Sequence, residues 1–131
     1  MTQPQLNDFC KEVFEANKLK GFDVSRQNIG QTLMLIVSEL SEALEAHRKG
    51  RNASLEGFYN GLNYMMDIHP EVERFKSSFI TYIKDSFEDE IADSFIRLMD
   101  LVGGLGIDID THIELKRRYN ATREHKHGKA Y

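Results

Sequence analysis

The sequence has no tryptophan, one cysteine and two prolines among 131 residues. Because Cys10 has no partner within the chain, an intramolecular disulfide is excluded, and the composition fits a reducing compartment. Apolar runs reach only a few residues, far fewer than the roughly 20 that a membrane-spanning helix needs. The first residues also lack the apolar core of a signal peptide. We therefore expect a cytoplasmic protein that does not enter a membrane.

An excess of basic residues is also missing. The chain carries 17 lysines and arginines against 21 aspartates and glutamates, which gives a formal net charge of −4. Proteins that bind nucleic acids by neutralising phosphates usually carry a basic excess, so we do not expect nucleic acid as a partner. The length suits a single domain, residues 1–131, which can bury a core without disulfides.

Alternating strand patterns are absent, and apolar residues recur at helical spacing instead. A first helix that stops near Gly21 is predicted by the stripe Leu6, Phe9, Cys10, Val13 and Phe14. A second helix is expected roughly from Arg26 to Lys49, with its apolar residues on one side. Residues 51–69 are compatible with a short helix or a loop, because glycines interrupt an aromatic-rich stretch.

The second half of the chain is also expected to be helical. Pro70 suits a first helical position, and helical spacing continues from there to Gly103 and Gly104, as one long helix or as two in series. Asp110 is predicted to be the N-cap of a last helix. The expected fold class is all-α, a bundle of four to five helices.

Two pairs of acidic residues lie at helical spacing on the two longest predicted helices. Glu39 and Glu42 fall on the edge of the apolar face of their helix, whereas Glu45 points outward. Glu90 and Asp93 lie beside the apolar face of theirs. We therefore expect both pairs to be partly buried where these faces pack together.

Four carboxylates in one place repel one another unless a cation neutralises them. Mg²⁺ takes oxygen ligands and often binds substrate phosphates as well, which points to phosphate chemistry; Mn²⁺ is a possible substitute. A structural alternative remains open, because 21 acids give about three such pairs by chance. In that alternative Glu39 and Glu42 pair with basic residues, and Asp93 bridges to Arg97, which we expect to be its ion-pair partner.

Three segments resemble one known family, the MazG-like all-α nucleoside triphosphate pyrophosphohydrolases, which include dimeric dUTPases and phosphoribosyl-ATP pyrophosphohydrolase. LIVSELSEALEAHRKG resembles the first metal motif of the family, Glu-x-x-Glu, as Glu39-x-x-Glu42. FEDEIADSFIRLMDLVGGLGIDID resembles the second, Glu-x-x-Asp, as Glu90-x-x-Asp93. The closing KRRYNATREHKHGKAY is also similar to MazG-type sequences. The spacer between the motifs is longer than in compact members, with a longer segment at about 51–84.

The resemblance implies a hydrolase in which Glu39, Glu42, Glu90 and Asp93 hold Mg²⁺ and carry the catalysis. Water attacks the α-phosphorus of a (d)NTP and releases a monophosphate and pyrophosphate. It also implies a homo-oligomer, a dimer or a tetramer. A narrower enzyme, dUTPase-like or phosphoribosyl-ATP pyrophosphohydrolase-like, and a non-catalytic module that binds a nucleotide or a partner remain as alternatives.

The last predicted helix offers a stripe of hydrogen-bond donors. Lys116, Asn120 and Arg123 follow one another at i, i+4 and i+7, and their side chains suit the oxygens of a triphosphate. They also match polar positions of the C-terminal segment of the family, which implies that they bind the substrate. A solvated charged face is the alternative interpretation of the same stripe.

Overall fold

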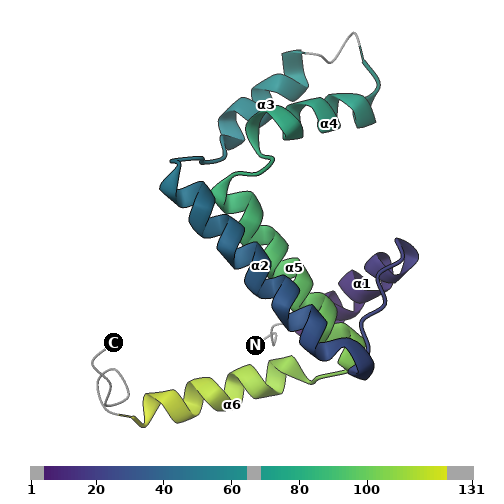
Figure 1. Ribbon diagram of the computed structural model, residues 1–131, viewed down its shortest axis with the longest axis vertical. Helices are drawn as coiled ribbons and strands as arrows, with labels where there is room; N and C mark the ends of the chain where they lie inside the picture. The colour runs from purple at the N-terminus through teal and green to yellow at the C-terminus, as the bar shows by residue number, and fades with distance from the viewer. Residues whose placement is uncertain (1–4, 65–68, 124–131) are drawn as a thin grey trace. The chain divides into compact units, whose positions relative to one another are not determined.

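The computed structural model describes residues 5–64 and 69–123. Within these ranges the chain forms six α-helices and one 3₁₀ turn and has no strand, so the all-α prediction is confirmed. None of these helices is both long and apolar enough to cross a bilayer. In chain order (Figure 1) they are α1 (Leu6–Leu19), α2 (Ile29–Arg48), α3 (Leu55–Tyr64), α4 (Glu71–Tyr82), α5 (Phe87–Leu105) and α6 (Ile109–Ala121).

The number of helices is larger than the four or five predicted. Residues 51–64 contain a helix, α3, where the sequence allowed either a helix or a loop. The stretch after Pro70 is two helices in series, because the helical pattern breaks at 83–86, where Asp85 has a positive φ of 63°. Backbone contacts divide the chain into two compact units, one of residues 30–97 and one of the two remaining parts.

The unit formed by both ends of the chain contains α1 and α6, which are joined at their N-termini. α6 starts at Ile109, and its N-cap is Asp108, whose carboxylate accepts a hydrogen bond from the Thr111 N–H at 3.2 Å. The prediction that Asp110 is this N-cap is therefore wrong. Asp110 caps α1 instead, because its two carboxylate oxygens accept the N–H groups of Leu6 and Asn7 at 3.1 and 3.2 Å.

The glycine pair on α5 serves packing and does not end the helix. α5 continues to Leu105 and is stopped by Gly106, which has a φ of 66°. A Cβ atom on Gly103 would collide with the backbone carbonyl of Cys10, and one on Gly104 would lie 3.0 Å from the Phe14 ring. The two glycines therefore let α1 approach the last turns of α5 closely, a contact that helical periodicity does not reveal.

In the unit of residues 30–97, α2 and the first half of α5 run side by side in opposite directions (Figure 1). The buried residues of α2 are small: Thr32, Ala43 and Ala46. Four residues of its apolar face are instead about half exposed, namely Leu33, Val37, Leu40 and Leu44. The prediction that this face is buried is therefore wrong for the single chain.

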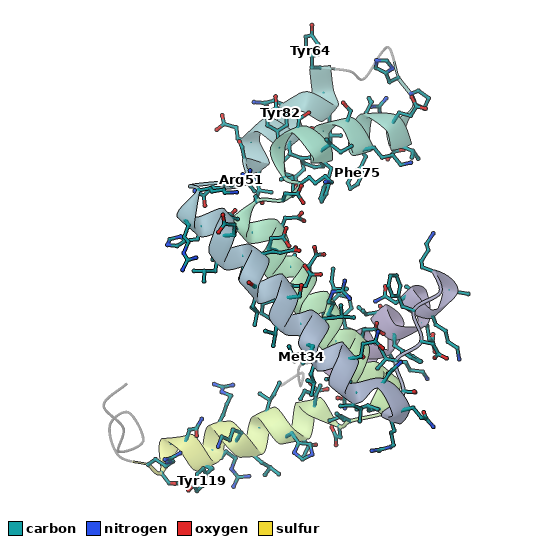
Figure 2. All side chains as sticks on the ribbon, viewed as in Figure 1. Met34, Arg51, Tyr64, Phe75, Tyr82 and Tyr119 are labelled. Atoms are coloured by element: carbon teal, nitrogen blue, oxygen red, sulfur yellow. The ribbon has the colours of Figure 1, made fainter. Side chains whose placement is uncertain are left out.

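The segment between the two acidic motifs forms a helical hairpin of α3 and α4 (Figure 1). Gly57 and Gly61 of α3 face α4 so closely that an added Cβ would lie 2.5 Å from Tyr82 and from Ser78, respectively. The Ser78 side chain is almost fully buried, and its hydroxyl donates to the Phe58 carbonyl at 2.6 Å. Tyr82, labelled in Figure 2, lies on the α3 side of α4.

Candidate functional site

The acidic residues of α2 and α5 meet in the unit of residues 30–97. Glu39 and Glu42 come from α2, and Glu90 comes from the first turn of α5. Each contributes a carboxylate oxygen, and these three oxygens all lie within 4.8 Å of one another. Three of the four predicted ligands are therefore neighbours, although residues 49–86 separate the two helices that carry them.

Glu90 is the buried member of this cluster. Its side chain is 5% exposed, and its Oε2 atom has no hydrogen-bond partner among the described residues. Removal from water, together with the nearby carboxyl groups of Glu42 and Glu39, raises the pKa of Glu90 from its usual 4.5 to about 8. A buried carboxyl group in this setting is either protonated or bound to a cation.

Glu39 is held by an arginine that lies one turn beyond the second acidic pair. Arg97 Nε donates to Glu39 Oε1 at 2.7 Å, and the Glu39 side chain is only 12% exposed. No ion pair joins Arg97 to Asp93 in the described part of the chain, so the prediction of that pair is wrong. The charge of Arg97 acts on Asp93, but its hydrogen bond goes to the carboxylate of Glu39 on the facing helix α2.

Asp93 lies beside the cluster and shares its electrostatic environment. Burial raises its pKa above the usual value, the charges of Asp89 and Glu39 act in the same direction, and the charge of Arg97 opposes them. Its carboxylate does not belong to the group of three close oxygens. The structure thus places the fourth predicted ligand near the other three, but not in contact with all of them.

Glu42 is exposed, so the predicted partial burial is confirmed for Glu39 but wrong for Glu42. The buried stripe of α2 passes through Ala43 and Ala46, which turns Glu42 toward water. Glu45 points outward as predicted and pairs with Lys49 at 3.2 Å. One carboxylate of the cluster is thus open to solvent and to any soluble ligand.

A second acidic group lies around Glu90 and is not among the predicted ligands. Asp85, Asp89 and Glu90 also place carboxylate oxygens within 4.8 Å of one another. Asp89 accepts the backbone N–H of Asp85 at 2.9 Å, and Asp85 pairs with Lys84 at 2.9 Å. The positive φ of Asp85 turns the chain into α5, and a helical projection of α5 alone does not include this residue.

The residues of the cluster fit a hard divalent cation. All three close donors are carboxylate oxygens, with no histidine or cysteine among them, which is the donor chemistry that Mg²⁺ and Mn²⁺ prefer. The partnerless Oε2 atom of Glu90 is the specific observation in favour of a cation, because a buried carboxylate without a partner is costly. Glu39, Glu42 and Glu90 would hold the ion, with Asp93 beside them.

The three predicted substrate-binding residues belong to the other compact unit. Lys116 and Asn120 lie on α6, and Arg123 follows its end. The ammonium of Lys116 and the guanidinium of Arg123 both lie over the Tyr119 ring, 5.3 and 5.6 Å from its centre. Asn120 has a buried Oδ1 atom without a hydrogen-bond partner in the described ranges. Substrate binding by these residues stays a prediction, and residues 124–131 of the same motif lie outside the described residues.

Comparisons with known proteins do not assign the chain to a family. No family model, curated protein or solved structure matches the chain. The resemblance of its motifs to MazG-like enzymes therefore stays a prediction. The arrangement of the acids is the observation on which a function can be proposed.

Proposed function

We propose that the protein is a Mg²⁺-dependent nucleotide pyrophosphohydrolase of MazG-like architecture, which hydrolyses a (d)NTP to a (d)NMP and pyrophosphate. The observation that carries the proposal is the cluster of Glu39, Glu42 and Glu90, together with the buried and partnerless Oε2 atom of Glu90. The order and the apolar context of the two motifs, Glu39-x-x-Glu42 and Glu90-x-x-Asp93, add support.

In the proposed reaction, a water oxygen forms a bond to the α-phosphorus, and the bond from this phosphorus to the bridging oxygen breaks. Pyrophosphate leaves with the electron pair of that bond. One glutamate of the cluster accepts the proton of the attacking water. A bound Mg²⁺ supplies neutralisation of phosphate charge and a lower pKa for water. Lys116, Asn120 and Arg123 are proposed to bind phosphate oxygens of the substrate.

A turnover assay with Mg²⁺ tests the proposal. The panel holds canonical NTPs and dNTPs, dUTP and phosphoribosyl-ATP, so that the two narrower activities appear as selectivity for one substrate. We expect pyrophosphate and monophosphate in equal amounts and no inorganic phosphate. In water labelled with heavy oxygen, the label should appear in the monophosphate. Label in the pyrophosphate would place the attack at the β-phosphorus and contradict the proposed reaction.

A non-catalytic binding module is the alternative outcome of the same assay. The Arg97–Glu39 ion pair favours it, because it shows that part of the acidic charge is balanced within the protein. If the folded protein binds Mg²⁺ and nucleotide but releases no product from any substrate of the panel, the binding module replaces the enzyme.

We also propose a homo-oligomer, a dimer or a tetramer, in which α2 forms part of the interface. Leu33, Val37, Leu40 and Leu44 repeat at the alternating spacing of four and three that packs helices together, and they are 46 to 51% exposed. Sedimentation at several concentrations should give a mass above that of one chain. Val37→Glu with Leu40→Glu should reduce it to the monomer mass, whereas an unchanged mass would exclude this face.

A further inference from the structure

A small hollow opens beside the acidic cluster at the end of α2. Its volume is about 270 Å³, and it is lined by Glu42, Glu45, Ala46, Arg51, Asp85 and Glu90. This volume is close to the lower end of the range of ligand pockets, about 300 to 1,000 Å³. Arg51 is the one positively charged residue in this lining. A hollow that joins the proposed cation site to an arginine has the charge pattern that suits a metal-bound anion.

The backbone of Arg51 is fixed on both sides. Its N–H donates to the Ala46 carbonyl at 2.9 Å in a turn that Gly50 allows with a φ of 68°, and its carbonyl accepts the N–H of Phe87 at 2.9 Å. Two residues later, the N–H of Ala53 donates to the carboxylate of Glu88 at 2.8 Å. Arg51 is thus anchored to the start of α5, near the junction of α2 and the hairpin where Figure 2 labels it.

Arg51 differs from three other basic residues near the cluster. Lys49 pairs with Glu45, Lys84 with Asp85, and Arg97 with Glu39, at 3.2, 2.9 and 2.7 Å, respectively. The Arg51 guanidinium forms no such ion pair within the described ranges, although four carboxylates share its hollow. A guanidinium offers a planar set of donors that matches two phosphate oxygens at once.

We infer that Arg51 binds the phosphate chain of the nucleotide, and specifically the pyrophosphate part that leaves. This inference rests on the proposed function, because the anion reaches the hollow together with the cation that the glutamates hold. The carboxylates alone would repel a polyphosphate, so a positive charge at their edge lowers that repulsion. Arg51 is then a substrate-binding residue that the sequence motifs do not include.

Calorimetric titration of pyrophosphate in the presence of Mg²⁺ tests the inference directly. Arg51→Ala should weaken pyrophosphate binding about tenfold or more, and Arg51→Lys should weaken it less, because the charge stays but the paired donors are lost. Arg48→Ala is the matched control, since it removes the same charge from the same end of α2 but does not line this hollow. It should leave pyrophosphate affinity within about twofold of the wild type.

Titration of Mg²⁺ alone provides the second readout. Arg51→Ala should leave the Mg²⁺ affinity within about twofold, which also shows that the variant is folded. A marked rise in Mg²⁺ affinity with unchanged pyrophosphate affinity would make Arg51 a counter-charge of the glutamates and overturn the inference. Absence of pyrophosphate binding by the wild type would overturn it as well.

The inference and the proposed function fail in different ways. If the wild type binds pyrophosphate through Arg51 but hydrolyses no nucleotide, the proposed hydrolysis fails and the role of Arg51 as a phosphate ligand stands. If the enzyme is active and Arg51→Ala changes neither KM nor pyrophosphate affinity, the enzyme stands and the inference is overturned.

Discussion

The α3–α4 hairpin and the acidic junction of α2 with α5 belong to the same compact unit, but they use their facing residues in opposite ways. In the hairpin, Gly57 and Gly61 bring two helices close together, and the buried hydroxyl of Ser78 has a partner. At the junction, Glu90 is equally buried, and one of its oxygens has no partner among the described residues. The polar group buried in the hairpin has its partner, whereas the acids of the junction are balanced only in part, by Arg97 at Glu39.

This difference follows from the cost of burying polar groups. A buried hydroxyl that donates to a carbonyl stabilises a fold modestly, by about 1 kcal/mol. A buried carboxylate without a partner destabilises it, unless the group takes up a proton or a cation binds. We therefore interpret the hairpin as a structural element and the junction as a binding site, and the following predictions test this contrast.

The largest expected effect is on turnover. Glu39→Gln combined with Glu90→Gln should lower kcat/KM on the order of 10³-fold, because the site then loses charges that stabilise the transition state through the cation. Glu90→Gln alone should unfold at a higher temperature than the wild type above about pH 8 in the absence of metal, since it removes a buried charge and keeps the Arg97–Glu39 ion pair. Glu73→Gln, at an exposed position of α4, should change neither property.

The next effect is a pH dependence of stability in the metal-free protein. The pKa of Glu90 is raised to about 8 in the folded state from 4.5, so the folded state binds more protons than the unfolded state between these values. The contribution of Glu90 is therefore fully present below about pH 4.5 and is lost as pH rises through about 8. Urea unfolding at several pH values should show this loss. An equally steep loss of stability in Glu90→Gln would show that another group causes the pH dependence.

A smaller effect is expected from overpacking the hairpin. Gly61→Ala should lower the free energy of unfolding by about 1 to 3 kcal/mol, because its Cβ meets the buried and hydrogen-bonded Ser78. Gly30→Ala is the control, since a Cβ there meets nothing within 4 Å and α2 should gain up to about 1 kcal/mol. Stabilisation by Mg²⁺ should be the same in both variants. Loss of this stabilisation in Gly61→Ala would show that packing in the hairpin affects cation binding at the junction.

The smallest effect is expected from the ion pair at the edge of the junction. Arg97→Gln should destabilise the metal-free protein by about 1 kcal/mol, because Glu39 loses its charged partner. The loss is no larger because the Arg97 side chain is about one third exposed, and water screens the ion pair. Millimolar Mg²⁺ should offset this loss, since a bound cation replaces the missing charge. Thermal unfolding with and without Mg²⁺ measures both values. A loss that Mg²⁺ leaves unchanged would argue against Glu39 as a ligand.

Local patterns predicted the helices well, because their signals lie within a few residues of each other. The stripe from Leu6 to Phe14 and the stop at Gly21 predicted α1, and the spacing of Glu39 and Glu42 placed them on α2. Helix contacts were not predictable in this way. Asp110 caps a helix about a hundred residues earlier in the chain, and a single helical pattern contains no information about that partner.

The same limit applies to the site. Periodicity placed Glu39 and Glu90 on faces that meet, but it assigned Arg97 to Asp93 on its own helix rather than to Glu39 on the facing one. Asp85 and Arg51 were missed because they lie outside the helices. Asp85 precedes α5 and Arg51 follows α2, so their positions depend on turn geometry. Hydrophobic periodicity also predicted burial for the α2 face that the single chain leaves half exposed.

The most direct test of the central claim is a calorimetric titration of Mg²⁺ into the wild type, Glu39→Gln with Glu90→Gln, and Glu73→Gln. Our account predicts saturable binding to the wild type and to Glu73→Gln, with proton release to the solvent near neutral pH as the incoming cation displaces the proton of Glu90. It predicts no binding to the double variant. Equal binding to all three proteins would show that the junction of α2 and α5 is not the cation site.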